Sequence, residues 1–216
     1  MANREPDQKA TKFFDDLWQK GDYWQLETSE FERAKYERQE NLLNDRRYRR
    51  VLEIGCGAGV FTKRLASLAE TVVAVDVSPA AIARARADSA TLRHVDFRVA
   101  NIMQFDVQAE GPWDLIVLGE TIYYLGWLYS FFDVCWLAHQ LFEATAKEGR
   151  LLMTNTYGGP TGHLLLPWII DTYRSLMLNL QYKVQHEERF EGTKDGVNLE
   201  VLISLLVKTD GSERRI

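Results

Sequence analysis

The chain has 216 residues, 46% of them hydrophobic and 26% charged, which is typical of a soluble globular protein with one full core. The net charge of −5 excludes the basic face that nucleic acid requires, and two cysteines outside any CxxC pair exclude a disulfide or zinc framework. The N-terminus is polar and no apolar run reaches the length of a membrane span, so we expect a cytoplasmic protein. The oligomeric state is not readable from the sequence.

The first fifty residues are predicted to be helical. Ser29 and Glu32 have the spacing of a capping box, which predicts a helix that reaches about Asp45. Because these residues precede the first core strand, they must pack across a face or an edge of the sheet. We expect a helical cap over residues 1–47 and a ligand-binding domain over residues 48–210. The cap is either a lid over a ligand or plain edge cover.

After residue 50, short β-branched runs alternate with helical patterns, which indicates βαβ units and a mainly parallel sheet. The predicted strands are 51–54, 71–76, 95–101, 113–119 and 150–156. Residues 182–192 and 197–208 are two further strands joined by a turn too short for a crossover helix. The sequence therefore predicts a doubly wound α/β fold with a mostly parallel sheet and an antiparallel last strand.

Several helices are predicted between these strands. Ser78 is expected as an N-cap with Pro79 at the first helical position. A further helix with a proline near its start is expected over about 163–180. One long helix ending near Gly149 is predicted from an apolar stripe at helical spacing. The stripe consists of Leu128, Phe131, Phe132, Cys135, Phe142 and Ala146.

The stretch VLEIGCGAGVF, residues 51–61, leads an apolar strand into three glycines and then a helix. Such a loop presents backbone N–H groups and a positive helix terminus to a ligand. The sixth position of the dinucleotide fingerprint GxGxxG is Val60, which argues against a nicotinamide or flavin site, and no GK[ST] follows for a nucleoside triphosphate. Glu53 would repel a pyrophosphate but suits a ligand that carries an ammonium group.

Polar side chains end the next strands at the same edge of the sheet. Asp76 ends the second strand, where its carboxylate can accept hydrogen bonds from a ribose diol. Asn101 ends the third strand and can pair along an adenine edge, and Glu120 follows the fourth. A ligand with a ribose, a base and a cationic amino-acid tail, but no phosphate, fits these groups. S-adenosyl-L-methionine meets each requirement.

The motifs VLEIGCGAG, VVAVDVS, RVANI and WDLIVLGETIYYL resemble those of class I S-adenosylmethionine-dependent methyltransferases over about residues 48–208. The resemblance implies a Rossmann-like, seven-stranded sheet with a cofactor groove along its carboxyl edge, and S-adenosyl-L-homocysteine as product. By motif position, the implied cofactor contacts are Glu53, Gly55 and Gly57 on the methionine side, Asp76 on the ribose, Val77, Asn101 and Ile102 around the adenine, and Glu120 beside the sulfonium. The family often has aspartate at the position of Asn101, whose amide keeps acceptor capacity.

The segment from Phe13 to Leu43 resembles the N-terminal part of methyltransferases related to nodulation protein S, which methylate an amino-sugar nitrogen. In those proteins this segment caps the cofactor groove. The resemblance therefore implies that Trp24 and Tyr36 contact cofactor or substrate.

Methyl transfer from a sulfonium depends on positioning and on the exclusion of water. An amine acceptor needs only to lose its proton, whereas a hydroxyl needs a stronger base or a metal, and the four histidines form no metal motif. Glu120 is a candidate to accept a proton or to steer a cationic amine. The other candidates on the substrate side are Tyr123, Tyr124 and Trp127 after the fourth strand, and Tyr157 and the general base His163 after the fifth.

The leading interpretation is an S-adenosylmethionine-dependent N-methyltransferase acting on a small molecule such as an amino sugar. A metal-independent O-methyltransferase is the first alternative, with His163 as its base. The second alternative is a protein that binds the cofactor without turning it over.

Overall fold

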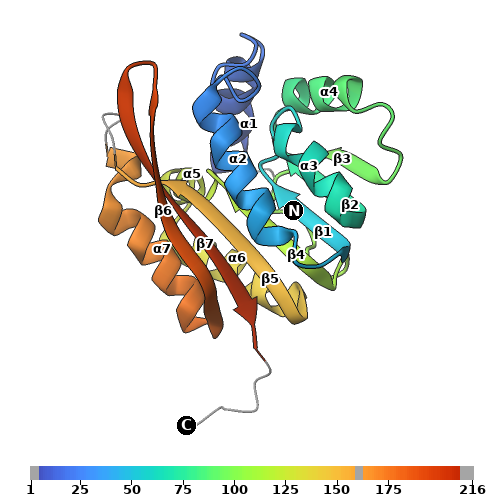
Figure 1. Cartoon of the computed structure of the whole chain (residues 1–216), viewed down its shortest axis with the longest axis vertical. Helices are drawn as coiled ribbons and strands as arrows, with labels where there is room; N and C mark the ends of the chain where they lie inside the picture. Colours follow the sequence, from blue (N-terminus) through green and yellow to red (C-terminus); the bar gives the residue numbers. More distant parts are fainter. Residues whose placement is uncertain (1–4, 159–162, 210–216) are drawn as a thin grey trace.

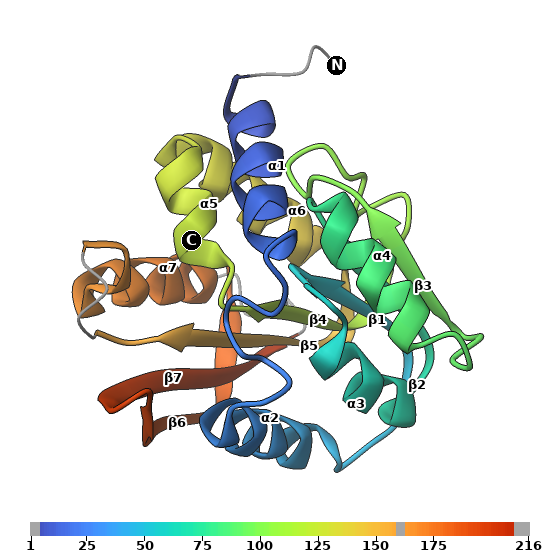
Figure 2. The same ribbon diagram turned by 90° about the horizontal axis from the view of Figure 1, so that it is seen from above.

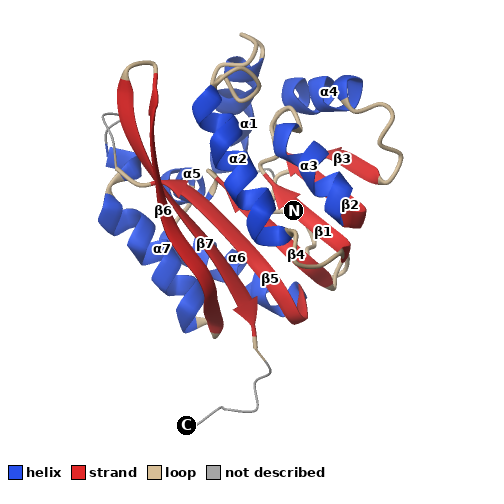
Figure 3. Ribbon diagram, in the orientation of Figure 1, coloured by secondary structure: helices blue, strands red, loops and turns tan. Residues whose placement is uncertain are grey.

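The computed structural model of the chain describes residues 5–158 and 163–209. Within them, one mixed sheet has the strand order β3-β2-β1-β4-β5-β7-β6 (Figures 1 and 3). The strands are β1 (Tyr48–Ile54), β2 (Ala69–Asp76), β3 (Val95–Val99), β4 (Trp113–Gly119), β5 (Thr145–Thr156), β6 (Tyr182–Lys194) and β7 (Val197–Lys208). Strand β7 runs antiparallel to both β5 and β6, and β1 to β5 are parallel. The predicted fold class is confirmed, including the reversed last strand.

Helices cover both faces of this sheet (Figure 2). They are α1 (Glu5–Trp18), α2 (Glu30–Leu43), α3 (Val60–Leu68), α4 (Pro79–Asp88), α5 (Ile122–Leu128), α6 (Phe131–Ala144), the 3-10 helix η1 (His163–Leu165) and α7 (Pro167–Asn179). Figure 2 shows α2 and α3 on one side of the sheet and α6 and α7 on the other. No helix among residues 5–158 and 163–209 is long and apolar enough to cross a membrane.

Strand β4 is central because it is apolar on both faces. Leu115 and Val117 pack into the cluster on the α2 and α3 side, whereas Ile116 and Leu118 pack into the cluster on the α6 and α7 side. All four side chains are buried, the pattern expected of a parallel strand between two helical layers. The carboxyl end of β4 is thereby held in the middle of the sheet edge, where open α/β sheets bind their ligands.

Helices α1 and α2 take different places. Helix α1 contacts α4 and α5, whereas α2 packs against α3 and β6. The carboxylate of Asp15 in α1 accepts hydrogen bonds from Ser78 Oγ and Ala80 N, both at 2.8 Å. An acidic side chain at a helix N-terminus is favoured by the unpaired N–H groups there. This contact fastens α1 to the start of α4.

The predicted long helix is wrong, because the chain breaks it into α5 and α6. Ser130 caps α6, its Oγ accepting from Asp133 N at 3.2 Å, and this new start resets the helical phase. Phe131 and Phe132, expected in the buried stripe, are 56% and 77% exposed. The stripe that α6 buries instead consists of Val134, Leu137, Ala138, Leu141 and Ala144.

The two serines predicted to cap helices behave differently. Ser78 is buried at the N-cap of α4, where its Oγ accepts from Ala81 N at 3.1 Å with Pro79 next in the chain, as predicted. Ser29 is the N-cap of α2 but makes no side-chain capping bond. Its capping-box partner Glu32 is instead engaged by two lysines.

We expect Ser78→Ala to lower the free energy of unfolding by about 1–2 kcal/mol, because it removes the cap of α4 and the hydrogen bond to Asp15. Ser29→Ala is the matched control and should cost clearly less, since no capping bond is lost. Urea denaturation of both variants measures the difference. Equal losses would contradict the role assigned to the capping bond.

Candidate functional site

The carboxyl edge of the sheet carries a cavity of about 420 Å³, in the size range of small-molecule sites. Its walls come from α1, α2, the loop after β1 and the ends of β2, β4 and β5. Most of the residues expected to bind cofactor or substrate line it. They are Trp24, Tyr36, Glu53, Gly55, Gly57, Asp76, Val77, Asn101, Ile102, Glu120, Tyr123 and Tyr124.

Two of the remaining candidates, Trp127 and Tyr157, are not among the described residues that line this cavity. Trp127 packs edge-on against Phe13 of α1 and lies under Lys9, whose Nζ is 4.5 Å from the ring centroid. Tyr157 donates its hydroxyl to Asp171 at 2.8 Å and lines a separate, open groove beside the β6–β7 turn. The side chain of His163 lies outside the described residues.

The glycine loop after β1 is held by the carboxylate at the end of β2. Asp76 Oδ2 accepts from Gly57 N, and Oδ1 accepts from Ser78 N, both at 2.9 Å. Gly57 has a φ of +53°, and a Cβ placed on it would lie 2.6 Å from the ring of Trp18. The loop therefore needs glycine there, both for its backbone conformation and for the close approach of α1.

Glu53 is buried in the wall of the cavity. Its Oε2 accepts from Thr62 Oγ1 of α3. Burial raises the pKa of the Glu53 carboxyl to about 8, and the nearby charge of Asp76 adds to the effect. At neutral pH the free protein therefore holds Glu53 as a neutral acid. A ligand ammonium placed beside it would favour the ionised form.

Asn101 is more engaged than its position at the end of β3 predicts. Its Nδ2 donates to Asp7 Oδ1 at 3.0 Å and to the hydroxyl oxygen of Tyr129 at 2.8 Å, and its Oδ1 accepts from Met103 N at 3.0 Å. The donors of the amide are thus taken up by α1 and by the residue after α5. A ligand that contacts Asn101 can therefore mainly donate a hydrogen bond to Oδ1, which still has a lone pair to accept it.

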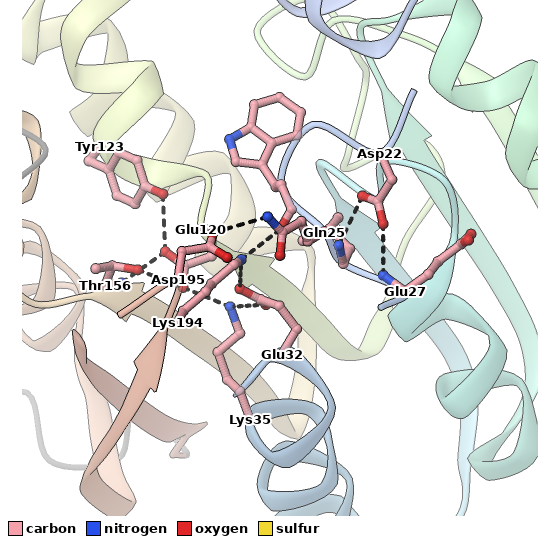
Figure 4. A network of polar contacts seen from close by, with 12 residues as sticks. Asp22, Gln25, Glu27, Glu32, Lys35, Glu120, Tyr123, Thr156, Lys194 and Asp195 are labelled. Carbon is pink, nitrogen blue, oxygen red and sulfur yellow. Dashed lines mark hydrogen bonds and ion pairs between the residues drawn. The ribbon is translucent and has the colours of Figure 1, made fainter. Parts of the chain in front are cut away.

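Four charged side chains of alternating sign also line the cavity, and we term them the ion chain: Lys194, Glu32, Lys35 and Glu120 (Figure 4). Lys194 Nζ is 2.7 Å from Glu32 Oε1, and Lys35 Nζ lies 2.7 Å from Glu32 Oε2 and 3.1 Å from Glu120 Oε1. The Lys35 side chain is only 3% exposed. Burial opposes its charge, but Glu120 and Glu32 outweigh burial and raise the pKa of Lys35, so it remains an ammonium.

The β6–β7 turn ties the ion chain to the segment between α1 and α2. Lys194 Nζ also donates to the backbone oxygen of Trp24 at 2.6 Å, and Gln25 Nε2 donates to Asp195 Oδ2 at 3.0 Å (Figure 4). Asp22 holds this segment in a turn by accepting from the backbone N–H groups of residues 26 and 27. The segment that carries Trp24 is therefore fixed to the β6–β7 turn by two hydrogen bonds.

Glu120 has all of its carboxylate lone pairs engaged. Its Oε2 accepts from the Tyr123 hydroxyl at 3.0 Å and from Thr156 N at 2.8 Å. Its Oε1 accepts from Thr156 Oγ1 at 3.2 Å and from Lys35 Nζ at 3.1 Å. The residue also has a φ of +52°, a conformation that costs a non-glycine residue energy and clusters at functional sites. For Glu120 to take a proton from an acceptor, one of these donors would have to leave.

Lys35, Glu32, Lys194 and Thr156 are the functional candidates that sequence reasoning missed. Glu32 and Lys35 were visible as an i,i+3 pair, a spacing that usually marks a solvated helix face. Their other partners are 162 and 85 residues away in the chain. No local pattern signals such contacts.

Two further observations bear on what the cavity holds. The hydroxyl of Thr154 is buried in the cavity wall without a hydrogen-bond partner, which suits a polar ligand. Among the residues that the structure describes, no group of three His, Cys, Asp or Glu side chains is arranged to hold a metal ion. The glycine loop, the buried carboxyls and the unpartnered Thr154 hydroxyl fit a ligand of the S-adenosylmethionine type.

The buried acid Glu53 makes stability depend on pH. We expect the free energy of unfolding to fall as the pH rises from 4.5 toward about 8, because the carboxyl ionises in the unfolded chain but stays protonated in the folded protein. Glu53→Gln removes this group, so the variant should lose less stability than the wild type across the same window. Urea titrations at both ends of the window test this. An unchanged pH dependence in Glu53→Gln would contradict the assignment.

The chain and its fold have counterparts among known proteins. Nodulation protein S of Bradyrhizobium diazoefficiens is 38% identical over 105 residues, 48% of this chain and 49% of that relative. A ubiquinone biosynthesis O-methyltransferase of Nitrobacter winogradskyi is 32% identical over 124 residues, 56% of this chain and 44% of that relative. The chain thus spans about half the length of the curated relatives that it matches.

The crystal structure of N-methyltransferase NodS from Bradyrhizobium japonicum WM9 in complex with S-adenosyl-L-homocysteine superimposes with a TM-score of 0.77, covering 93% of this chain and 99% of that one. At 22% identity this likeness concerns the fold. The family model for nodulation protein S (NodS) matches residues 8–130. Since that match covers more than half of the 216 residues, the protein belongs to the nodulation protein S family.

Proposed function

We propose that the protein is an S-adenosylmethionine-dependent methyltransferase that transfers a methyl group to the nitrogen of a small-molecule amine, such as an amino sugar. The observation that carries the proposal is one cavity lined by two sets of polar groups. The glycine loop with Asp76 and the buried acid Glu53 is one set, and the ion chain with Tyr123 is the other. Membership of the NodS family supports nitrogen as the methyl acceptor, because a solved NodS is described as an N-methyltransferase.

The cavity offers contacts for each part of the cofactor. Asp76, although it already holds the glycine loop, keeps acceptor capacity for a ribose diol, and Val77 and Ile102 give an apolar wall for the adenine. When bound, the cofactor supplies a methyl group on a sulfonium, which is already activated for transfer. Glu53 faces the amino-acid tail, where an ammonium would stabilise its ionised form.

Aromatic side chains cover the part of the cavity that is proposed to bind the cofactor. Trp18 and Trp24 pack with their ring centroids 5.5 Å apart, and Phe14 contacts both Trp24 and Tyr124. These rings come from α1, from the segment before α2 and from α5. They exclude water, so the protein's part in the reaction is positioning in a dry site. The helical cap expected over residues 1–47 thus acts as a cover of the cofactor.

A metal-independent O-methyltransferase is the second candidate, because the relative from Nitrobacter winogradskyi carries that name. A hydroxyl acceptor needs a base at the transfer point. Glu120 is within hydrogen-bond reach of Tyr123 there, but its oxygens are already engaged by four donors. The saturated carboxylate therefore favours nitrogen over oxygen.

Incubation with the radiolabelled methyl donor and a pool of amines and phenols tests the function. We expect an N-methylated product from an amine such as glucosamine. A product labelled only on oxygen would establish the second candidate. Tight binding of the donor without transfer to any acceptor would show a protein that binds the cofactor and does no chemistry.

Asp76→Ala is expected to weaken binding of S-adenosyl-L-homocysteine by roughly 1.5–3 kcal/mol, the scale of hydrogen bonds to a charged group. Glu70→Ala, an exposed acid on the same strand, is the matched control and should bind like the wild type. Calorimetric titration measures both. Unchanged affinity in Asp76→Ala would remove Asp76 from the site.

A further inference from the structure

We propose that Lys35 determines the charge state in which the acceptor binds, so that an amine acceptor enters the cavity only as the uncharged free base. The proposal rests on the proposed function and deepens it. It makes Lys35 a specificity-determining residue and Glu120 a positioning residue rather than a proton acceptor. Glu120, which the sequence suggested could steer a cationic amine, is already paired with Lys35.

The first step of the argument is the hydrogen bonding of Glu120. A carboxylate oxygen offers two lone-pair positions, and both oxygens of Glu120 have two donors each, including Lys35 Nζ at 3.1 Å. An acceptor ammonium would have to displace Lys35 to reach this carboxylate. Lys35 is held against displacement by Glu32 at 2.7 Å and by its burial.

The second step is the balance of charge around Glu120. The ion chain pairs Lys35 with Glu120 and Lys194 with Glu32, so its formal charges cancel. Glu53, on β1, is protonated near neutral pH in the free protein because burial raises its pKa, and with the cofactor bound its ionised form would be paired with the ammonium of the amino-acid tail. Within the ion chain, each carboxylate is already paired with a lysine, and Asp76 in the same cavity is engaged by the backbone N–H groups of Gly57 and Ser78. An ammonium that gives up its hydration on entry therefore finds no unengaged carboxylate among these groups.

The tyrosines near Glu120 are also uncharged. Burial raises the pKa of Tyr36 on α2 and of Tyr123 and Tyr124 on α5, so all three are neutral hydroxyls. Tyr123 donates its proton to Glu120, and its oxygen keeps acceptor capacity although the Tyr124 hydroxyl is also within hydrogen-bonding reach. A neutral amine can donate an N–H to that oxygen and keep its lone pair for the methyl group, whereas an ammonium has no lone pair to offer.

The reaction balances without a base on the enzyme. The lone pair of the free amine forms the new N–C bond while the C–S bond breaks and its electron pair stays on sulfur, which becomes a neutral thioether. The product leaves as a methylated ammonium, whose surplus proton goes to water. The proton that the acceptor carried in solution is lost before binding.

Proton release on acceptor binding tests the proposal directly. Glucosamine, whose ammonium loses its proton near neutral pH, is titrated by calorimetry into protein saturated with S-adenosyl-L-homocysteine, in buffers of different ionisation enthalpy. Below the pKa of the amine we expect the wild type to release close to one proton for each glucosamine bound. The dissociation constant for total amine should rise about tenfold for each pH unit below that pKa.

Lys35→Met leaves Glu120 without its cation, so this variant should bind the ammonium form, release few protons and lose the steep pH dependence. Lys35→Arg keeps the cation and should behave like the wild type. The double variant Lys35→Met/Glu120→Gln removes both charges and should restore proton release. Lys63→Met, which alters an exposed lysine on α3, is the matched control and should change nothing. Thermal melting confirms that each variant is folded.

Binding of glucosamine by the wild type without proton release would overturn the proposal and leave the methyltransferase function standing. A Lys35→Met variant that is folded and still releases one proton would overturn the role of Lys35. Failure of glucosamine to bind at any pH would overturn the inference for amino sugars. The proposed function falls separately, if radiolabel transfer finds no acceptor at all.

Discussion

The ion chain is the constraint on which the rest of the site depends. Burying four charged groups costs free energy, and this cost is offset only while all four groups remain paired with one another. Glu32 and Lys35 lie on α2, Lys194 lies on β6, and Glu120 directly follows β4. Because these elements are distant in sequence, the chain of contacts forms only in the complete fold. It sets the position of α2 and, through Lys194 and Trp24, that of the cover.

The two sets of polar groups in the cavity differ in their electrostatics. Around the glycine loop, Asp76 accepts from backbone N–H groups and Glu53 is neutral in the free protein, so a ligand proposed to bind there would bring its own charge. In the ion chain, the charges are already balanced within the protein, and the neutral hydroxyl of Tyr123 donates to Glu120. Because the methyl donor is already activated, transfer requires mainly that the acceptor is positioned beside it and that water is excluded.

The sequence predicted several of the residues that line the cavity because they sit at fixed places relative to strands. Glu53, Asp76 and Asn101 each stand at or near the carboxyl end of a predicted strand, and parallel strands bring those ends to one edge. Lys35 and Lys194 could not be found in this way. Their roles arise from tertiary contacts over 85 and 162 residues of chain, for which no local periodicity exists.

The failed predictions also have local physical causes. The stripe through Phe131 and Phe132 had helical spacing, but the cap at Ser130 restarts the helix and turns both rings to the surface. Trp127 stands in the motif expected to face the substrate, yet α1 covers it through Phe13. In each case a contact outside the motif decides where the side chain points.

A crystal structure of the protein with S-adenosyl-L-homocysteine bound would test the central claim most directly. The account predicts that Lys35 Nζ stays within hydrogen-bond distance of Glu120 Oε1 while Asp76 accepts from the ribose. A structure in which Lys35 has turned away and left Glu120 open to the acceptor space would contradict it.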